Sequence, residues 1–466
     1  MSYYDNLTEF SDRVALITEK REKITYAQLE KEADEIVDVL NPRSVVFLVC
    51  KNCKESIYIY IGLLRKKVVP VLINNNINTE LFKNLIISYN PSYIYIPEEN
   101  QELRFNFEVI KTYGGYNVVK TIYNDEYEIN DKLALLLTTS GSTGSPKLVR
   151  QSYRNIDSNA EAIADYLQIS ADDKAITTMT MSYTYGLSII NSHLLRGACL
   201  ILNEHTLMEK QFWALLKEEE ATTFGGVPYV YEMLKKLRFS RMDLPSLKYI
   251  TQAGGKLSPD LAEEFSRVCM EKGIKLIIMY GQTEATARMS YLPWEHALSK
   301  AGSMGIAIPG GEFYLIDSDN NVINEDEMVG ELIYKGDNVT FGYAEDFGDL
   351  IKGDENHGIL HTGDMAKRDK DGFYYIVGRK KRFLKIFGNR INLDEVEAML
   401  RNKDYECICT GVDDKLHIYT TNENTESDII QFISSQTKLN STAFKVTYIE
   451  EIPRNDSGKI LYSALN

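Results

Sequence analysis

Apolar residues recur along this chain at two different spacings. Between residues 23 and 40 they follow helical order behind Thr25, which predicts a helix with Thr25 as its N-cap. Residues 44–50 consist of Ser44 followed by six apolar residues, which is typical of a strand buried on both faces. A helical stretch at 54–65 and a second apolar run at 68–73 follow, so the sequence predicts a strand–helix–strand unit.

The same alternation recurs at 81–96 and then runs from residue 152 to residue 279. The predicted helices span 152–168, 186–195, 208–219, 228–237 and 258–272, and the predicted strands span 174–180, 198–203, 221–226, 247–252 and 274–279. Alternating strands and helices of this kind predict an α/β fold with large parallel or mixed sheets flanked by helices.

The pattern changes near residue 302. From 302 to 379 glycines are dense and the predicted strands are short, which indicates a small β-rich subdomain. A basic cluster at 379–382 precedes a compact α+β unit with helices at 394–402 and 426–436. The sequence therefore predicts two domains: an N-terminal domain, residues 1–379, and a C-terminal domain, residues 380–466.

Composition and charge narrow the class of protein. Of the 466 residues, 44% are hydrophobic and 26% are charged, as in an ordinary globular protein. The net charge of −15 argues against non-specific binding of nucleic acid or of an acidic membrane. The N-terminus has no signal-peptide pattern, and the apolar runs fall well short of the ~20 residues of a membrane helix. We therefore predict a cytoplasmic protein without membrane insertion.

Six cysteines in a chain of this length do not form a disulfide framework. Cys50 and Cys53 have the spacing of a redox or half-zinc motif, but no second C-x-x-C motif accompanies them. Cys50 also ends an apolar, strand-like run, so we interpret this pair as structural.

The strongest candidate for chemistry is the stretch from Thr138 to Lys147, which follows the apolar run 133–137. It combines two glycines, six hydroxyl side chains and a lysine, which suits a polyphosphate cradled by backbone N–H groups. A flexible polar turn is the alternative. The spacing is not that of a Walker A motif, and residues 147–152 indicate a second strand; both argue against a P-loop NTPase but not against a nucleotide.

Four further clusters carry groups suited to a nucleotide. Tyr280-Gly281-Gln282-Thr283-Glu284 follows a strand, where α/β folds bind ligands, and Glu284 is an oxygen ligand of the kind that Mg²⁺ prefers. Asp364 follows a glycine turn and suits ribose hydroxyls. The remaining clusters offer cations, at Arg379, Lys385 and Arg390 and, near the C-terminus, at Lys459.

Taken in this order, these motifs resemble the adenylate-forming superfamily of acyl-CoA synthetases, peptide-synthetase adenylation domains and luciferases. The resemblance extends from the Thr25-Tyr26-x-x-Leu29 segment to Gly458-Lys459. It implies an AMP-forming acid–thiol ligase that uses ATP and Mg²⁺ and activates a small carboxylic acid as acyl-AMP. It also implies that the C-terminal domain is a mobile lid.

The resemblance places the nucleotide on matching positions of this chain. The residues implied to hold the β- and γ-phosphates are Thr139, Ser140, Gly141, Ser142, Thr143, Gly144 and Lys147. Ala253, Gly254 and Gly255 would lie along the adenine, and Tyr280 and Gly281 belong to the same nucleotide site. Thr283 would contact the α-phosphate, Glu284 would bind magnesium, Asp364 would bind the ribose with Arg379 beside it, and Arg390 would lie near a phosphate.

The lid residues have implied roles in the two half-reactions. Lys459 would bridge the carboxylate and the α-phosphate during adenylation, as a catalytic residue with Thr283 and Glu284. Lys381 matches the hinge, and Gly388 matches the glycine that leaves room for the pantetheine thiol. The implied acceptor is the thiol of CoA or of a phosphopantetheinylated acyl carrier protein. The chain is shorter than is usual in this superfamily, which puts a dedicated pocket for the CoA nucleotide in doubt, so a carrier protein remains a possible partner.

The predicted acyl pocket departs from the family pattern. Tyr183 stands before Gly186 where a histidine often lies, and no aspartate for an α-amino group occurs between Thr180 and His193. Gln252 and Arg288 are candidate polar contacts; Arg288 either pairs with a polar or anionic substrate tail or caps a helix at the surface.

Two alternatives to a thiol ligase remain open at this stage. The first is a stand-alone adenylating enzyme that passes the acyl group to a carrier protein, an amine or a hydroxyl. The second is a non-catalytic nucleotide-binding relic, against which the retention of Glu284, Asp364, Arg379 and Lys459 argues.

Overall fold

The structure is a computed structural model that describes residues 2–123, 127–138, 147–387, 389–454 and 460–465. The chain divides into two compact units, and each is described by itself. The first comprises Met1–Glu312 and Tyr334–Leu360, and the second comprises Phe313–Ile333 and His361–Asn466. The predicted boundary at residue 379/380 stays a prediction.

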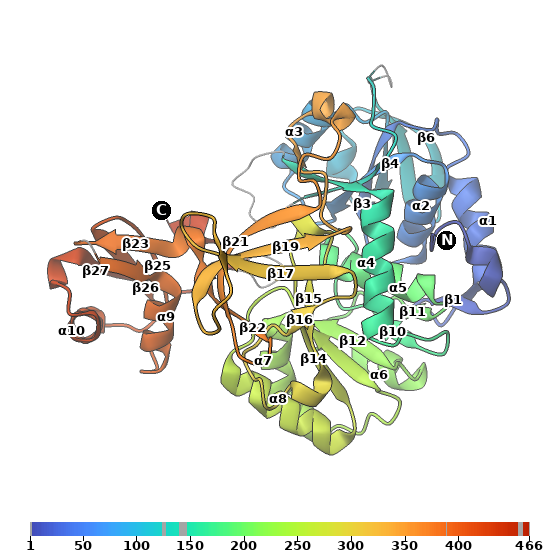
Figure 1. Cartoon of the computed structure of the whole chain (residues 1–466). Helices are drawn as coiled ribbons and strands as arrows, with labels where there is room; N and C mark the ends of the chain where they lie inside the picture. Colours follow the sequence, from blue (N-terminus) through green and yellow to red (C-terminus); the bar gives the residue numbers. More distant parts are fainter. Residues whose placement is uncertain (1, 124–126, 139–146, 388, 455–459, 466) are drawn as a thin grey trace. The chain divides into compact units, whose positions relative to one another are not determined.

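A nine-stranded sheet forms one half of the first unit, in the order β16-β15-β14-β13-β12-β10-β11-β1-β2 (Figure 1). Its six central strands, from β14 to β1, run parallel, and antiparallel strands complete both edges. The strands are β1 (Val14–Ile17), β2 (Lys23–Thr25), β10 (Lys174–Ile176), β11 (Cys199–Ile201), β12 (Thr223–Gly226), β13 (Tyr249–Gln252), β14 (Lys275–Tyr280), β15 (Ser290–Leu292) and β16 (Ile306–Ala307).

An eight-stranded sheet forms the other half, in the order β20-β9-β8-β4-β3-β5-β7-β6. Its strands are β3 (Val45–Cys50), β4 (Val69–Asn74), β5 (Tyr93–Pro97), β6 (Glu108–Tyr113), β7 (Tyr116–Lys120), β8 (Leu133–Thr138), β9 (Leu148–Ser152) and β20 (Tyr343–Ala344). The helices of this unit are α1 (Tyr26–Ile36), α2 (Lys54–Arg65), α3 (Thr79–Tyr89), α4 (Tyr153–Tyr166), α5 (Thr184–Leu195), α6 (Lys210–Glu218), α7 (Pro228–Lys236) and α8 (Pro259–Lys272).

Strand β3 explains why the first unit has several layers. All six of its side chains are buried, but Val46, Leu48 and Cys50 face one core while Val45, Phe47 and Val49 face another. Because successive side chains of a strand point to opposite sides, an unbroken apolar run must be covered on both faces. Helices α1, α2, α4 and α5 contribute to the first core and α3 to the second.

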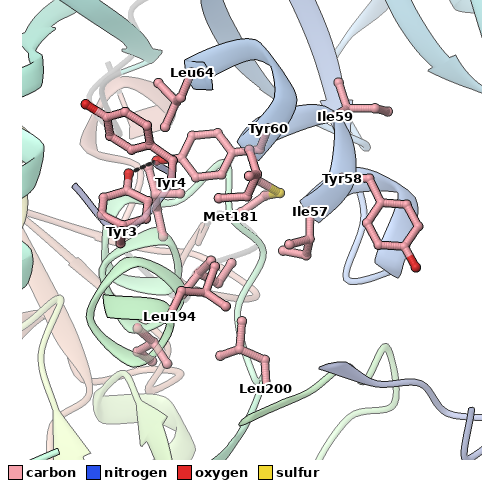
Figure 2. Packing of buried hydrophobic residues seen from close by; sticks show 14 of the residues in the cluster. Tyr3, Tyr4, Ile57, Tyr58, Ile59, Tyr60, Leu64, Met181, Leu194 and Leu200 are labelled. Carbon is pink, nitrogen blue, oxygen red and sulfur yellow. Dashed lines mark hydrogen bonds between the residues drawn. The ribbon is translucent and has the colours of Figure 1, made fainter. Parts of the chain in front are cut away.

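The N-terminal segment closes the first core, as Figure 2 shows. Tyr3 and Tyr4 are 2% and 1% exposed, and the hydroxyl of Tyr3 lies 2.6 Å from that of Tyr60 on α2. Tyr60 in turn donates to Oδ1 of Asn191 on α5 (3.1 Å). These bonds satisfy hydroxyl groups that would be costly to bury unpaired.

The second unit begins with a five-stranded sheet, in the order β18-β17-β19-β21-β22. Its strands are β17 (Gly311–Ile316), β18 (Val322–Ile323), β19 (Val329–Gly336), β21 (Ile359–Arg368) and β22 (Tyr374–Arg379). An α+β segment follows, with β23 (Phe383–Ile386), β24 (Asn389–Asn392), α9 (Leu393–Arg401), β25 (Cys407–Val412), β26 (Lys415–Thr420), α10 (Glu426–Thr437) and β27 (Phe444–Tyr448). The fold class predicted from the sequence is confirmed.

Several local predictions are confirmed and a few are wrong. Thr25 caps α1 through a capping box with Gln28. The strand predicted at 174–180 ends at Ile176, and the carbonyl groups of residues 179 and 180 lie against Gly186 of α5 instead of in the sheet. The hairpin of β6 and β7 was not predicted.

All six cysteines are free of disulfides, as the sequence predicted. Five are buried, and Cys53 is half-buried. Burial raises the pKa of every one of these thiols, to about 11 at Cys53 and about 12 at Cys199, Cys269 and Cys407. Within the part of the chain that is described, no helix is long and apolar enough to cross a membrane.

We predict that Gly62→Ala destabilises the first unit by about 1–3 kcal/mol or more, the usual cost of overpacking a core. Gly62 lies where α2 crosses α1, and a Cβ atom there would overlap the backbone oxygen of Ala33. Both tryptophans, Trp213 and Trp294, belong to this unit, so their fluorescence during urea unfolding measures the loss. The control is Gly353→Ala, because a Cβ at exposed Gly353 meets nothing within 4 Å.

Candidate active site

The central feature of the candidate site is a reversal of the chain between β14 and β15. The predicted motif Tyr280–Glu284 leaves the carboxyl end of β14, and the chain returns as β15, antiparallel to β14. A Cβ atom at Gly281 would overlap the backbone of Ala287. Glycine is therefore required at position 281, because only its missing side chain lets the returning strand pass this closely.

Thr286 occupies a backbone conformation that β-branched residues almost never adopt. Its φ of 66° and ψ of −63°, together with the hydrogen bond from Ala287 N to Ala285 O (2.7 Å), form a strained γ-turn. Thr286 is held there from several sides. Its hydroxyl donates to the carbonyl of Asn338 (2.7 Å), and its own carbonyl accepts from Nε2 of Gln151 (3.3 Å) and from the hydroxyl of Thr184. Strain held by so many contacts is typical of functional sites.

Glu284, the predicted magnesium ligand, lies on the short 3₁₀ helix Thr283–Ala285. Its carbonyl accepts from the backbone N–H (3.0 Å) and the hydroxyl (2.9 Å) of Thr340. Its Oε1 accepts from the hydroxyl of Tyr343 (2.6 Å). Burial, and secondarily the carboxylate of Glu284, raise the pKa of Tyr343, so this hydroxyl stays a donor.

The geometry of Glu284 fits a magnesium ion. The carboxylate is half-buried, one oxygen is oriented by Tyr343, and Oε2 has no protein partner among the described residues. Those residues contain no group of three or more side chains with metal-binding spacing. A single carboxylate is sufficient for Mg²⁺, because this ion usually keeps several waters and takes its other ligands from phosphate oxygens.

The predicted phosphate loop lies between two confirmed strands. β8 and β9 are antiparallel, and Thr138 pairs with Leu148 at their open end. Lys147 contacts the ring of Tyr343, with Nζ 4.0 Å from the ring centre. Tyr343 therefore connects Lys147 to Glu284. The other predicted loop residues, Thr139, Ser140, Gly141, Ser142, Thr143 and Gly144, lie outside the described residues.

The predicted adenine segment adjoins two tyrosines of the predicted acyl pocket. Gly254 has a φ of +82°, and a Cβ there would overlap the hydroxyl of Tyr183. A Cβ at Gly225 would lie 2.8 Å from the hydroxyl of Tyr185, which bonds Thr251 (2.7 Å). Glycines at these strand ends thus leave space that tyrosine hydroxyls occupy.

Two further predicted residues shape the same region. Gly186 lets the start of α5 approach the carbonyl oxygens of residues 179 and 180. Gln252 is fully buried and its Nε2 donates to the carbonyls of Ala253 (3.2 Å) and Gly255 (2.9 Å), while its Oε1 has no partner among the described residues.

A small pocket opens beside the reversal and is partly open to solvent; its cavity volume is about 10 Å³, close to the space that a single water needs. Its lining includes Gln151, Asn159, Thr184, Ser188 and Ala287. Arg288 follows Ala287 and is 2% exposed, so the alternative of a surface arginine is wrong.

The second unit places Asp364 and Arg379 directly opposite each other on β21 and β22. Asp364 is buried, and its Oδ1 accepts from Nε of Arg379 (2.6 Å), which is about half exposed. Gly363, expected in a turn before Asp364, lies within strand β21 and has a φ of +69°. The sequence prediction that Arg379 lies beside Asp364 is thus matched by the geometry, while their role toward a ribose stays a prediction.

The predicted hinge, Lys381, lies between two anchored neighbours. Lys380 pairs with Glu331 of β19 (2.5 Å), whereas Arg382 pairs with Asp394 (2.6 Å) and Glu397 (2.5 Å) of α9. The segments before and after the hinge position are therefore held by different elements. Of the other predicted lid residues, Arg390 lies on β24, and Gly388 and Lys459 lie outside the described residues.

The sequence did not predict the residues that contact the site from a segment far away in the chain. Tyr343, Thr340 and Asn338 contact the reversal from a segment more than 50 residues later in the chain. Isolated polar residues of this kind carry no local signal, because their partners are set only by the tertiary fold.

Comparison with known families identifies the chain. The sequence model of a family described as "AMP-binding enzyme" matches residues 4–344. A 2-succinylbenzoate–CoA ligase of Bacillus cereus is 27% identical over 472 residues, covering 97% of this chain and 94% of the relative. An oxalate–CoA ligase of Arabidopsis thaliana is 26% identical over 496 residues, covering 97% and 95%.

Solved structures share the fold. An O-succinylbenzoate coenzyme A synthetase from Bacillus subtilis in complex with AMP superposes with a TM-score of 0.82 at 22% identity, covering 100% of this chain and 98% of that one. The same synthetase in complex with ATP and a magnesium ion gives a TM-score of 0.80 at 22% identity, covering 100% and 99%.

The buried His193 predicts a dependence of stability on pH. Its Nδ1 lies 2.8 Å from the carbonyl of Ile189, its Nε2 lies 3.3 Å from the hydroxyl of Tyr249, and burial lowers its pKa to about 4. Between pH 6.5 and pH 4 the unfolded chain therefore takes up a proton that the folded chain does not, so folding is weakened as the pH falls. We expect a loss of about 3 kcal/mol from this residue by pH 4.

His193→Gln should remove this part of the acid sensitivity, as measured by urea unfolding at pH 7, 5.5 and 4.5. The exposed His296 provides the control, because His296→Gln should leave the pH profile of the wild type unchanged. A profile for His193→Gln that falls as steeply as that of the wild type would contradict the assignment.

Proposed function

The chain belongs to the family of AMP-binding enzymes, and from this premise we propose that it is an ATP-dependent, AMP-forming ligase of small carboxylic acids and coenzyme A. The observation that carries the proposal is the strained reversal after β14, which holds Thr283 and Glu284, the two residues proposed to contact the nucleotide and its magnesium ion. The relatives named as CoA ligases support coenzyme A as the acceptor.

The reaction takes place in two half-reactions. A carboxylate oxygen attacks the α-phosphorus of ATP, pyrophosphate leaves and acyl-AMP forms. The sulfur of coenzyme A, after loss of its proton, then attacks the acyl carbon; the bond to AMP breaks and a thioester results. The acyl-adenylate is reactive because AMP is a good leaving group from a mixed anhydride.

The first half-reaction brings two anions together, so the protein must offset their repulsion. Glu284 would hold Mg²⁺, with its carboxylate oriented by Tyr343, and Thr283 would donate to the α-phosphate. When bound, the ion neutralises charge on the phosphate oxygens. Lys147 would support the leaving pyrophosphate, and its contact with Tyr343 keeps its charge near Glu284.

Asp364 and Arg379 are proposed to bind the ribose, and Arg390 a phosphate. The ion pair between Asp364 and Arg379 fixes the aspartate on β21. Lys381 is proposed as the hinge of a lid, and Gly388 as part of the thiol channel. Lys459 is proposed to supply the positive charge between carboxylate and α-phosphate.

The proposal is tested by pyrophosphate release over a panel of carboxylic acids that includes oxalate, 2-succinylbenzoate and saturated mono- and dicarboxylic acids. We expect release with at least one acid, and formation of an acyl-CoA when coenzyme A is added. Release followed by transfer only to a phosphopantetheinylated carrier protein would favour the stand-alone adenylating enzyme. No release with any acid would contradict the proposal and favour a nucleotide-binding relic.

Lys459→Ala should separate the two half-reactions. We expect adenylation to fall about 10²–10³-fold, the usual cost of losing a group that stabilises charge in the transition state. Thioester formation from preformed acyl-AMP should stay within a few-fold of the wild type, because this step does not join carboxylate to ATP. The control is Lys370→Ala, at an exposed lysine in a turn. Equal loss of both half-reactions would refute the role of Lys459.

A further inference from the structure

Arg288 is a buried cation with a rigid backbone. Its side chain and backbone together are 2% exposed. Its carbonyl accepts from Nδ2 of Asn159 (2.9 Å) and of Asn338 (3.2 Å), and Asn159 and Asn338 are themselves buried. The position of the residue directly after the strained γ-turn is thus fixed from two other segments.

The guanidinium of Arg288 contacts only neutral groups. Nε donates to Oγ of Ser188 (3.1 Å), and Nη1 donates to the hydroxyl of Tyr166 (3.1 Å) and approaches Sδ of Met279 (3.3 Å). The ring centre of Tyr185 lies 5.1 Å from Cζ. Among the described residues Nη2 has no hydrogen-bond partner, and no carboxylate lies within ion-pair distance.

The other buried arginine of the described chain is treated differently. The side chain of Arg150 is fully buried, and it pairs with the carboxylate of Glu355. Its guanidinium also donates to the carbonyls of Phe341 (2.8 Å), Tyr343 (3.0 Å) and Lys352 (2.6 Å). This is the usual structural solution, because a buried guanidinium needs acceptors for its five N–H groups and an opposite charge. Arg288 lacks both.

The carboxylate of Asp173, which affects the pKa of two buried groups in this region, already has a cationic partner. Asp173 raises the pKa of both His193 and Tyr249, but its Oδ1 accepts from Nζ of Lys248 (2.8 Å). His193 is neutral at pH 7 because burial lowers its pKa, and the positive charge of Arg288 adds to this lowering. The tyrosine hydroxyls around Arg288 are neutral too, because burial raises their pKa. The surroundings therefore leave one positive charge uncompensated.

An uncompensated buried charge weakens folding, and proteins retain such groups chiefly where a ligand supplies the missing charge. Arg288 lies beside the region predicted to hold the acyl group. Its partner Ser188 and its neighbour Ala287 line the small pocket at the reversal, and the ring of Tyr185, which Arg288 contacts, also contacts the ring of Tyr183. A substrate group that reached Ser188 would therefore lie next to the guanidinium of Arg288.

We propose that Arg288 binds a second carboxylate on the substrate, so that the enzyme activates dicarboxylic acids, one carboxylate reacting with ATP and the other pairing with Arg288. This inference rests on the proposed function and names its substrate class. A carboxylate fits better than a neutral acceptor, because it can accept from the N–H groups of Nη2 and at the same time supplies the negative charge that the surroundings of Arg288 lack. The small volume of the pocket lined by Ser188 and Ala287 favours a short acid.

The experiment compares dicarboxylic acids with their monomethyl esters, in which a methyl group replaces the second negative charge. The panel comprises oxalate, malonate, succinate, glutarate, adipate and phthalate, each with its monoester, and kcat/KM is measured by pyrophosphate release. For the best diacid we expect the kcat/KM of the wild type to exceed that for its monoester by about 100-fold or more. The reason is that a bound monoester would leave the buried charge of Arg288 unpaired. Equal rates for the best diacid and its ester would overturn the inference.

Variants identify Arg288 as the source of that preference. Arg288→Met should lower kcat/KM for the diacid about 100-fold and abolish or reverse the preference over the ester. Arg288→Lys keeps the positive charge but loses the planar guanidinium, so its kcat/KM for the diacid should lie between those of the wild type and Arg288→Met. The control is Arg267→Met at an exposed arginine paired with Glu263, and it should match the wild type. A diacid preference that survives in Arg288→Met would overturn the assignment.

A binding measurement without turnover separates recognition from a structural role. In the absence of ATP, the preferred diacid should raise the melting temperature of the wild type and have no such effect on Arg288→Met. The unliganded variant should be at least as stable as the wild type, because it lacks the unpaired charge; marked destabilisation would indicate a structural arginine. If no acid supports pyrophosphate release, the proposed function itself fails, whereas equal release with mono- and dicarboxylic acids refutes only this inference.

Discussion

The close contact between Gly281 and Ala287 is the constraint on which the candidate site depends. Because the backbone of Ala287 occupies the space of a side chain at position 281, the chain must turn within a few residues of the end of β14. That sharp turn forces Thr286 into its strained conformation, and Asn338, Gln151 and Thr184 hold it there. The rest of the site is arranged along this turn: Thr283 and Glu284 before it and Arg288 after it. One backbone contact thus sets the spacing between the groups proposed for the nucleotide and the group proposed for the acid.

Two buried arginines show how the first unit divides its charges between stability and recognition. Arg150 joins β9 to the segment 341–355 through a carboxylate and several carbonyls, and so fixes the strand that follows the predicted phosphate loop. Arg288 has a comparable burial and few acceptors. The contrast matters because both lie in the same unit, under the same constraints of packing. The difference between Arg150 and Arg288 is therefore one of role: Arg150 contacts other parts of the protein, whereas Arg288 is proposed to contact the substrate.

Much of the fold followed from periodicity, and the reason is visible in particular elements. The apolar run 45–50 predicts a doubly buried strand whatever its neighbours are, and Thr25 with Gln28 forms a local capping box. The two strands around the predicted phosphate loop were found in the same way. By contrast, the bond between Tyr343 and Glu284 joins residues 59 positions apart, and Thr286 gives no local sign of its strain. Such features depend on the tertiary fold, so sequence patterns could name the motif but not its supports. The burial of Arg288 belongs to the same class, since the sequence alone left a surface position open.

The cysteines have a practical consequence for spectroscopy. A thiol reacts with maleimides and similar reagents as the thiolate, and here burial both shields the native thiols and keeps them protonated near neutral pH. A cysteine introduced at an exposed position would therefore react far faster than any of the six native ones. Each unit can thus carry a single fluorophore in an otherwise unaltered chain, and energy transfer between two such labels would report the distance between the units during turnover.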